Sequence, residues 1–435
     1  MRLLTIFTLG LIVAFAQSSR ITVCYYTNWA QYRYGDGVKF LPEDIDPNLC
    51  THILYSFAKI DPTSHEVLNY EWNDDSMIQR VIALKTQNPS LKVICSIGGW
   101  NHEKQPRYSN MAQTAATRKT FIDSLMKYLS DHKYDGVDID WEYPGNRPTG
   151  TPAGDKEKYT TLLQEIRARF TQENTGYSLT ASVAAGRKVI VKAYEIEKIK
   201  DYVDWVNLMA YDLHGSWENV TGHTTAMADV VPTVPDSLNA WLEGGMPPSQ
   251  IALGIATYGR SFTLANAKNA ELGAPANGPG LAGRYTRAQG FLSYYEVCAS
   301  DWDAMTTYEA SAAKAPYASK NNQWIGYETP ESVAYKVKTL VNGHNLKGIA
   351  VWALDLDDFG NKFCKLGKYP IINAAKNAMS ADANDNKIKF HSSARKQKVC
   401  VANPRWHSFK TSLEKWCKLE CLNAKLCPPW MCMCF

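Results

Sequence analysis

Three acidic residues alternate with apolar residues in the segment Y-D-G-V-D-I-D-W-E-Y at 134–143. Alternate side chains of a β-strand face the same side, so Asp138, Asp140 and Glu142 are expected to share one face. Like charges held this close cannot all stay ionised, and the pKa of at least one carboxyl should therefore rise. A protonated carboxyl at the end of a strand is the group that donates a proton to a glycosidic oxygen. The segment therefore predicts an acid catalyst, with Glu142 as the acid.

Two other interpretations of this acidic segment are a solvated edge and a metal site. A solvated edge does not account for Val137, Ile139 and Trp141, which alternate with the acids and are expected to pack against helices. A metal site would require His or further ligands nearby, and none stand out. We therefore expect no metal and no cofactor. Asp135 has the opposite parity to the acids, and we expect it to give structural support.

Two further segments end in residues that suit the same site. The segment S-I-G-G-W at 96–100 combines Trp100 with glycines that permit a tight exit from a strand. The segment M-A-Y-D at 209–212 offers the hydroxyl of Tyr211 and the carboxylate of Asp212. Sugars present apolar C–H faces that stack on aromatic rings. Trp100 and Trp352, both at strand ends, are therefore expected to line a cleft, and Trp141 to belong to the core.

Eight short apolar or β-branched runs must position these residues. Stretches with helical periodicity separate most of the runs, most clearly at 118–129 and 156–170. Alternating strands and helices predict βαβ units and a parallel sheet. Eight units predict an α/β fold, a closed (β/α)8 TIM barrel whose active site lies at the carboxyl ends of the strands. The runs span 21–26, 51–57, 91–97, 134–142, 178–183, 203–211, 251–257 and 348–353.

The rest of the chain divides around this barrel, which is expected to span 20–378. The long interval between the last two runs predicts a small inserted subdomain at about 260–326. Residues 379–399 are mostly polar and are expected to form a linker. Six cysteines crowd into 400–435, which predicts a small disulfide-rich C-terminal module. Six cysteines allow 15 pairings, and the sequence does not choose among them.

The amino-terminal segment and the cysteine usage predict a secreted, extracellular protein. Residues 1–16 read as a signal peptide, with Arg2 before an apolar stretch. The alternative is a membrane anchor, but a spanning helix needs about 20 apolar residues. Eleven cysteines agree with an oxidising compartment, and the odd count leaves Cys95, in an apolar run, as the expected free thiol. Asn219 begins an N-V-T sequon and is a glycosylation candidate.

The overall charge gives no reason to expect a polyanionic partner. The formal net charge of the 435 residues is +4, which is small for this length. The sequence contains no Walker motif, zinc spacing or dinucleotide fingerprint. We therefore expect no nucleic acid and no membrane as partner, and a monomeric protein.

The pattern D-x-x-D-x-D-x-E, with S-x-G-G before it and M-x-Y-D after it, resembles glycoside hydrolase family 18. The likeness extends over 21–376, and Y-T-N-W-A-Q-Y at 26–32, T-Y-G-R-S-F at 257–262 and V-W-A-L-D at 351–355 resemble animal chitinases of that family. The resemblance implies an α+β insertion between strands 7 and 8. It also implies a retaining chitinase with chitin and chitooligosaccharides as partners. The alternatives are a catalytically silent chitinase-like lectin and an endo-N-acetylglucosaminidase that acts on N-glycans.

The resemblance also assigns roles to the catalytic residues. Glu142 would protonate the leaving oxygen and later activate water, while the acetamido oxygen of the substrate attacks the anomeric carbon. Asp140 would orient that acetamido group and stabilise the cationic oxazolinium intermediate. Asp138 would share a proton with Asp140. Tyr211 and Asp212 would hold the acetamido group from the far side.

Cleft contacts, two disulfides and a role for the tail are implied in the same way. The disulfides would be Cys24–Cys50 and Cys298–Cys364. The tail spacing W-C-x3-C-x5-C-P-x3-C-x-C is similar to small modules of invertebrate chitin-active enzymes, which implies chitin binding; the alternative is a stabilising or partner-binding knot. The implied substrate-binding residues are Tyr25, Trp29, Phe57, Glu71, Trp72, Trp100, Asn101, Met209, Trp217, Tyr258, Arg260, Glu296 and Trp352.

Overall fold

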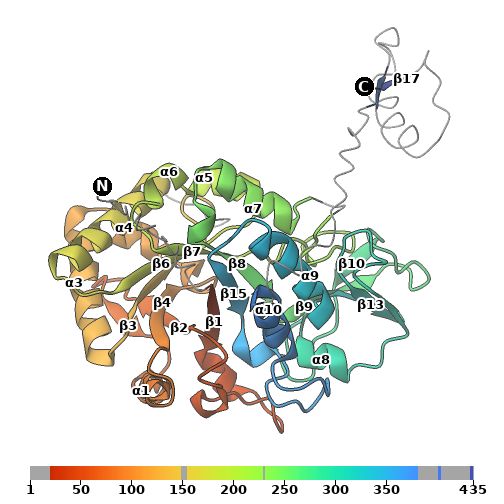
Figure 1. Cartoon of the computed structure of the whole chain (residues 1–435), viewed down its shortest axis with the longest axis horizontal. Helices are drawn as coiled ribbons and strands as arrows, with labels where there is room; N and C mark the ends of the chain where they lie inside the picture. Colours follow the sequence, from red (N-terminus) through yellow and green to blue (C-terminus); the bar gives the residue numbers. More distant parts are fainter. Residues whose placement is uncertain (1–19, 148–153, 229–230, 381–399, 403–431, 435) are drawn as a thin grey trace, which may run out of the picture. The chain divides into compact units, whose positions relative to one another are not determined.

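The computed structural model describes residues 20–147, 154–228, 231–380, 400–402 and 432–434. Eight parallel strands pair in a closed ring, in which the last strand returns to the first (Figure 1). The predicted (β/α)8 TIM barrel is therefore confirmed. The barrel strands are β1 (Ile21–Thr27), β2 (His52–Ile60), β4 (Lys92–Gly98), β5 (Gly136–Asp140), β6 (Ser178–Val183), β7 (Trp205–Leu208), β8 (Ile251–Ala256) and β15 (Gly348–Trp352).

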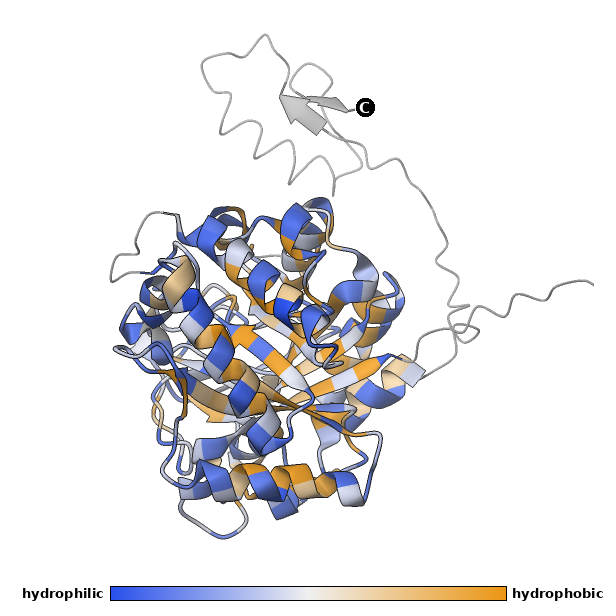
Figure 2. Ribbon diagram, turned by 90° about the vertical axis from the view of Figure 1, so that its left-hand side faces the viewer, coloured by the Kyte–Doolittle hydropathy of each residue, from blue (hydrophilic) through white to orange (hydrophobic). Residues whose placement is uncertain are grey.

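Helices cover the outer face of the barrel and bury its strands. Strands that are buried on both faces require continuous apolar sequence, and β8 (Ile251–Ala256) is buried at every position. Figure 2 shows the hydrophobic strands inside, with helices around them that carry hydrophilic residues on their outer sides. The covering helices include α1 (Asp74–Ala83), α3 (Ala115–His132), α4 (Asp155–Gln172), α5 (Arg187–Ala193), α7 (Val234–Glu243), α9 (Pro330–Lys336) and α10 (Pro370–Ser380).

The ends of helix α3 show why the chain turns where it does. The Thr114 hydroxyl accepts a hydrogen bond from the Thr117 backbone N–H at 3.1 Å and caps the first turn. Lys133 follows the last turn in a left-handed conformation with φ of 59°, which ends the helix. The chain then enters β5, which carries two of the three acids.

The strands β5 and β7 end earlier than the sequence predicts. Strand β5 stops at Asp140, so Glu142 stands just beyond the ladder rather than within it. Strand β7 stops at Leu208. The Met209 N–H still bonds to the Val183 carbonyl of β6, but the N–H groups of Ala210 and Tyr211 bond two residues back, to the carbonyls of Leu208 and Met209. Glu142 and the pair Tyr211 and Asp212 therefore lie on backbone that has already left the sheet.

A second, antiparallel sheet lies between β8 and β15 in the sequence. Its strands are β9 (Tyr258–Leu264), β10 (Ala276–Pro279), β11 (Phe291–Ser293), β12 (Ala304–Thr306), β13 (Tyr317–Lys320) and β14 (Gln323–Gly326), with helix α8 (Tyr294–Ala299). Strands β10, β11 and β14 all pair with β9. This sheet and helix form the α+β insertion, drawn in cyan and green-blue in Figure 1.

The chain divides into two compact units, at 1–380 and 381–435. In the second unit, β16 (Cys400–Ala402) and β17 (Cys432–Cys434) pair antiparallel. The predicted signal peptide at 1–16, most of the linker at 379–399 and most of the module at 400–435 lie outside the described residues. Within the described ranges, no helix is both long and apolar enough to cross a membrane.

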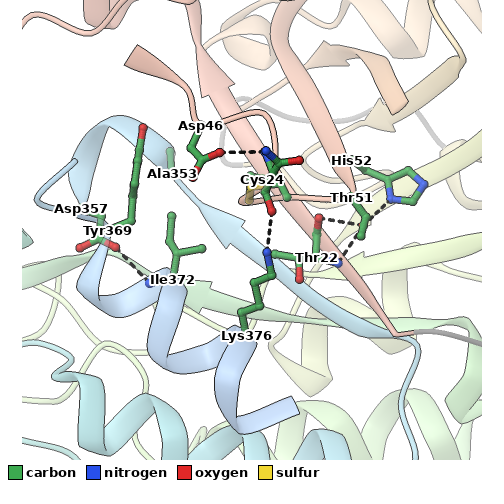
Figure 3. The surroundings of a disulfide bond; sticks show 12 residues. Thr22, Cys24, Asp46, Thr51, His52, Ala353, Asp357, Tyr369, Ile372 and Lys376 are labelled. Atoms are coloured by element: carbon green, nitrogen blue, oxygen red, sulfur yellow. Dashed lines mark hydrogen bonds between the residues drawn. A yellow bond between two sulfur atoms is a disulfide. The ribbon is translucent and has the colours of Figure 1, made fainter. Parts of the chain in front are cut away.

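Both implied disulfides of the barrel unit are present. Cys24 on β1 bonds to Cys50, which precedes β2, and Lys376 of α10 donates to the Asn48 carbonyl beside it at 2.6 Å (Figure 3). Cys298 on α8 bonds to Cys364, so this bond links the insertion to the barrel. Cys95 is a free, buried cysteine, as predicted.

Removing the Cys298–Cys364 bond is expected to destabilise the protein. Because it closes a loop with a sequence separation of 66, against 26 for Cys24–Cys50, its loss should increase the entropy of the unfolded chain more. The double variant Cys298→Ala/Cys364→Ala should therefore lose about 2–4 kcal/mol of unfolding free energy in urea denaturation. The matched Cys24→Ala/Cys50→Ala variant should lose less. An unchanged urea midpoint for both variants would contradict the expectation.

Candidate active site

The acidic segment places its carboxyls at the carboxyl end of the barrel, as the strand parity predicts. Asp138 is 0% and Asp140 is 2% exposed, whereas Glu142 is half-buried. Val137, Ile139 and Trp141 lie on the other side in the core, and the Trp141 ring stacks on Tyr108 with centroids 5.1 Å apart. The result is a column of carboxyls that runs from the barrel interior to its mouth.

Asp138 lies in a ring of hydrogen-bond donors from three neighbouring strands. Its Oδ1 accepts from the Thr180 hydroxyl at 2.7 Å and the Asn207 amide at 3.0 Å. Its Oδ2 accepts from the hydroxyls of Ser96 at 2.9 Å and Ser182 at 2.7 Å. Burial raises the pKa of Asp138, while these four hydrogen bonds oppose the rise. The ring therefore holds a buried carboxyl in a fixed position.

Sequence reasoning missed the donors around Asp138, although a signal for three of them exists. Ser96 and Thr180 are the direct ladder partners of Asp138 on β4 and β6, and Ser182 has the same parity as Thr180. Polar residues at inward positions of neighbouring buried strands indicate a shared partner. That signal can be read only when the register between the strands is known.

Asp140 is the least satisfied carboxyl of the column. Its Oδ1 is buried and has no hydrogen-bond partner among the described residues. Burial raises the pKa of Asp140 well above its ordinary value, and the negative charges of Glu142 and Asp138 raise it further. A buried polar atom without a partner costs about 1–3 kcal/mol, so the fold holds this carboxyl at a cost in stability.

Two tyrosine hydroxyls share the electrostatic surroundings of Asp140 and Glu142. Burial raises the pKa of Tyr211 well above its ordinary value, and the negative charges of Asp140 and Glu142 raise it further. Burial also raises the pKa of Tyr143, as do the charge of Glu142 and a hydrogen bond to it. Both phenols therefore stay protonated and keep a proton that a hydrogen bond can use. Sequence reasoning identified Tyr211 and missed Tyr143.

Asp212 is held by the insertion rather than left open. Arg260 donates to both of its oxygens, from Nε at 2.7 Å and from Nη2 at 2.6 Å, and the Tyr258 hydroxyl donates to Oδ1 at 2.7 Å. The same guanidinium lies over the exposed Trp217 ring at 5.5 Å. Asp212 adopts a left-handed backbone with φ of 54°, an uncommon conformation for a residue other than glycine. These bonds tie the end of β7 to the first strand of the insertion.

Four aromatic residues form a packed cluster at the mouth of the barrel. Trp352 at the end of β15 lies 5.1 Å from Tyr25, 5.9 Å from Phe57 and 6.2 Å from Trp29, measured between ring centroids. The Tyr25 hydroxyl is 2.6 Å from the Ser182 hydroxyl, which bonds Asp138. The cluster therefore adjoins the carboxyl column, as the sequence predicts for Trp352.

A pocket of about 330 Å³ lies between this cluster and the insertion. Trp29 and Trp352 line it from the barrel, and Tyr285, Thr286 and Phe291 line it from the insertion. The three acids do not line this pocket. Because Trp352 lines it and also packs against Tyr25, the pocket adjoins the column on the side of the insertion.

The other residues that the family resemblance implies as substrate contacts differ in how exposed their side chains are. Trp72 and Trp100 are 85% and 56% exposed, and Asn101 is also exposed. Met209 is 8% exposed and packs in the barrel interior. Glu71 accepts a hydrogen bond from the Tyr32 hydroxyl at 2.8 Å.

Glu296, which the resemblance implies as a substrate contact, has a carboxylate that binds donors of the protein itself. It is 4% exposed, and its Oε1 accepts from the backbone N–H groups of Tyr285 at 2.6 Å and Thr286 at 2.9 Å. Its Oε2 accepts from the Thr286 hydroxyl and from the N–H and hydroxyl of Ser293. Five protein donors occupy this carboxylate, so the structure gives Glu296 the task of holding the loop that lines the pocket.

Asp135 and Asn219 lie outside the carboxyl column. Asp135 accepts from the Val93 N–H at 2.8 Å and pairs with Lys85 and Lys92, so it supports the start of β5. Asn219 is exposed in the segment after β7.

Among the described residues, no group of three His, Cys, Asp or Glu side chains is arranged to hold a metal ion.

The barrel and the column of carboxyls at its mouth are features of the (β/α)8-barrel glycoside hydrolases. Comparison with known sequences then gives the family. The profile of glycosyl hydrolases family 18 matches residues 21–357, and the chain belongs to this family.

Individual relatives include both active and inactive proteins. Chitotriosidase-1 of Mus musculus is 42% identical over 363 residues, which cover 80% of this chain and 76% of that protein. The crystal structure of an immunomodulatory active chitinase from Trichuris suis is 38% identical, covers 83% of this chain and 100% of that chain, and superposes with a TM-score of 0.77. Human YKL-39, described as a pseudo-chitinase with retained chitooligosaccharide binding properties, is 37% identical, with coverage of 83% and 100% and a TM-score of 0.76.

Proposed function

We propose that this protein is a secreted chitinase that hydrolyses β-1,4 bonds between N-acetylglucosamine units with retention of configuration. The observation that carries the proposal is the column of Asp138, Asp140 and Glu142. A protein that only binds sugar has no need of stacked carboxyls with raised pKa values, which cost stability. The three acids therefore favour the enzyme over the catalytically silent lectin.

The proposed mechanism uses the acetamido group of the substrate as the nucleophile. Glu142 donates its proton to the leaving oxygen, and later takes a proton from the attacking water. The unpartnered Oδ1 of Asp140 receives the acetamido N–H and stabilises the positive charge that develops on the sugar. The protonated hydroxyl of Tyr211 donates to the acetamido oxygen.

In this proposal Asp138 and Asp212 have more specific roles than the family resemblance gives them. Asp138, with its four donors, keeps Asp140 oriented and contributes to the rise in its pKa. Asp212 acts together with Arg260, which holds its carboxylate in a bidentate pair at the side of the insertion. The exposed rings of Trp72, Trp100 and Trp217 provide stacking surfaces for the chitin chain.

The experiment that tests this function is a product analysis. The protein is incubated with the fully acetylated N-acetylglucosamine hexamer and with colloidal chitin, and cellohexaose serves as the control substrate without acetamido groups. We expect shorter N-acetylglucosamine oligomers and no cleavage of cellohexaose. Binding of the hexamer without cleavage would favour the lectin, and release of N-glycans from a glycoprotein would favour the endo-N-acetylglucosaminidase.

We further propose that the module at 400–435 binds chitin. A chain that ends at Ser380 should cleave the soluble hexamer as the full chain does, because every site residue precedes that point. It should act less well on colloidal chitin, since a tethered binding module raises the effective concentration of enzyme at the surface. Pull-down by chitin measures the difference, and equal retention of both chains would favour a stabilising knot.

A further inference from the structure

A charged side chain covers one face of an aromatic ring beside the carboxyl column. The Arg147 guanidinium lies over the Trp100 ring at 4.2 Å from its centroid, and its Nη2 donates to the Trp100 carbonyl at 2.6 Å. This double contact fixes the guanidinium to both the ring and the backbone. Sequence reasoning assigned no role to Arg147.

Both partners are fixed close to the candidate acid. Gly99, which precedes Trp100, donates its N–H to the Asp140 carbonyl at 2.9 Å, so Trp100 leaves β4 directly beside the end of β5. Arg147 follows Glu142 by five residues, and the turn between them is closed by the Asn146 N–H and the Tyr143 carbonyl at 3.0 Å. The arginine therefore connects the loops that follow two neighbouring strands at the catalytic mouth.

The ring keeps one face for a ligand. Trp100 is 56% exposed although the guanidinium covers part of it, so the opposite face remains open. The guanidinium lies about 4 Å from the Trp100 ring on one side, and a sugar stacked on the other side would also lie about 4 Å from the ring. The sugar is therefore roughly 8 Å from the guanidinium. A guanidinium is always charged, so the position carries a constant positive charge.

We propose that Arg147 is a specificity-determining residue that disfavours a glucosamine unit at the sugar position stacked on Trp100. This inference rests on the proposed chitinase function. Glucosamine differs from N-acetylglucosamine by an ammonium group in place of the acetamido group. The carboxyls of β5 attract such a cation into the cleft, and Arg147 repels it at Trp100. The protein therefore selects acetylated chitin over deacetylated segments at this position, in addition to any requirement of the chemical step.

The expected size of the effect follows from the distance between the charges. Two like charges about 8 Å apart at a partly exposed site change the relative binding by roughly two- to thirty-fold, for effective dielectric constants from 80 to 20. Salt screens this repulsion, because the Debye length falls from about 10 Å at 0.1 M to about 3 Å at 1 M.

The test compares arginine variants on partly deacetylated chitosan at about pH 5, where amines are protonated. Arg147→Gln removes the charge and keeps much of the length of the side chain, whereas Arg147→Lys keeps the charge and loses the planar stack. Arg169→Gln removes one positive charge from the last turn of α4, where Arg169 pairs with Asp123 and Glu173, and is the matched control. Mass spectrometry of end-labelled products gives the glucosamine frequency at each position on both sides of the cleaved bond.

We expect Arg147→Gln to raise the glucosamine frequency at one position by about two-fold or more at low salt, and less at 1 M salt. Arg147→Lys and Arg169→Gln should keep the wild-type pattern. Equal frequencies at every position in wild type and Arg147→Gln would overturn the proposal. An equal change in Arg147→Gln and Arg147→Lys would also overturn it, because it would show that stacking rather than charge sets the preference. Failure of wild type to cleave the fully acetylated hexamer would instead refute the proposed function.

Discussion

Glu142→Gln is expected to abolish turnover of the N-acetylglucosamine hexamer while binding is retained. Gln has nearly the shape of Glu but cannot donate a proton to the leaving oxygen. General acid–base catalysis by one group contributes about 10²–10⁴-fold, and kcat should fall by at least this factor. The Kd of the hexamer, measured by isothermal titration calorimetry, should stay within a few fold of the wild-type value.

The matched control for this variant is Glu173→Gln. Glu173 lies at the end of α4, where it pairs with Arg169 at the surface, so the same chemical change should leave kcat unaltered. Turnover by Glu142→Gln close to the wild-type rate would show that another group is the acid. Loss of both turnover and binding would show that Glu142 is needed for the shape of the site.

Asp140→Asn should reduce kcat about 10²–10³-fold, the range seen when one group that stabilises developing charge is removed. The amide can orient the acetamido group but cannot offset the positive charge of the intermediate. The neutral amide also removes the largest charge acting on Tyr211, so the pKa of that hydroxyl should fall towards its ordinary value. Steady-state kinetics on the hexamer measure the loss, which should appear in kcat more than in KM.

The fold of this variant should persist, which separates a catalytic effect from a structural one. Among the described residues the Oδ1 of Asp140 has no hydrogen-bond partner to lose, and the four donors of Asp138 are untouched. The thermal unfolding midpoint should therefore stay near or above the wild-type value, since a buried charge near two others is removed. A kcat within a few fold of wild type would rule out the role assigned to Asp140.

Much of the barrel could be predicted because each strand is a local feature of the sequence. Runs of β-branched and apolar residues mark all eight strands, and the run at 178–183 matches β6 at both ends. Strand parity alone placed Asp138 and Asp140 inward and Trp141 in the core. The ends of β5 and β7 were less predictable. Strand β5 stops at Asp140, and after β7 the N–H groups of Ala210 and Tyr211 bond two residues back instead of continuing the ladder.

The polar contacts of the site could not be predicted in the same way, because they join residues far apart in the sequence. The ring around Asp138 depends on the register of four strands. The pair of Asp212 and Arg260 spans 48 residues and requires the insertion to fold back onto the barrel. The backbone and hydroxyl donors that bind the Glu296 carboxylate were likewise not predictable, because they depend on how the loop at Tyr285 and Thr286 folds.

The anomeric form of the first products is the most direct test of the proposed mechanism. An enzyme that carries its own nucleophile does not need an N-acetyl group on the sugar, whereas this site assigns no carboxylate to that task. Proton NMR of the hexamer during the first turnovers should show the new reducing end in the β configuration, because two inversions give retention. On partly deacetylated chitosan, every new reducing end should be N-acetylglucosamine. An initial α product, or frequent glucosamine at the new reducing ends, would contradict the substrate-assisted mechanism and the roles proposed for Asp140 and Tyr211.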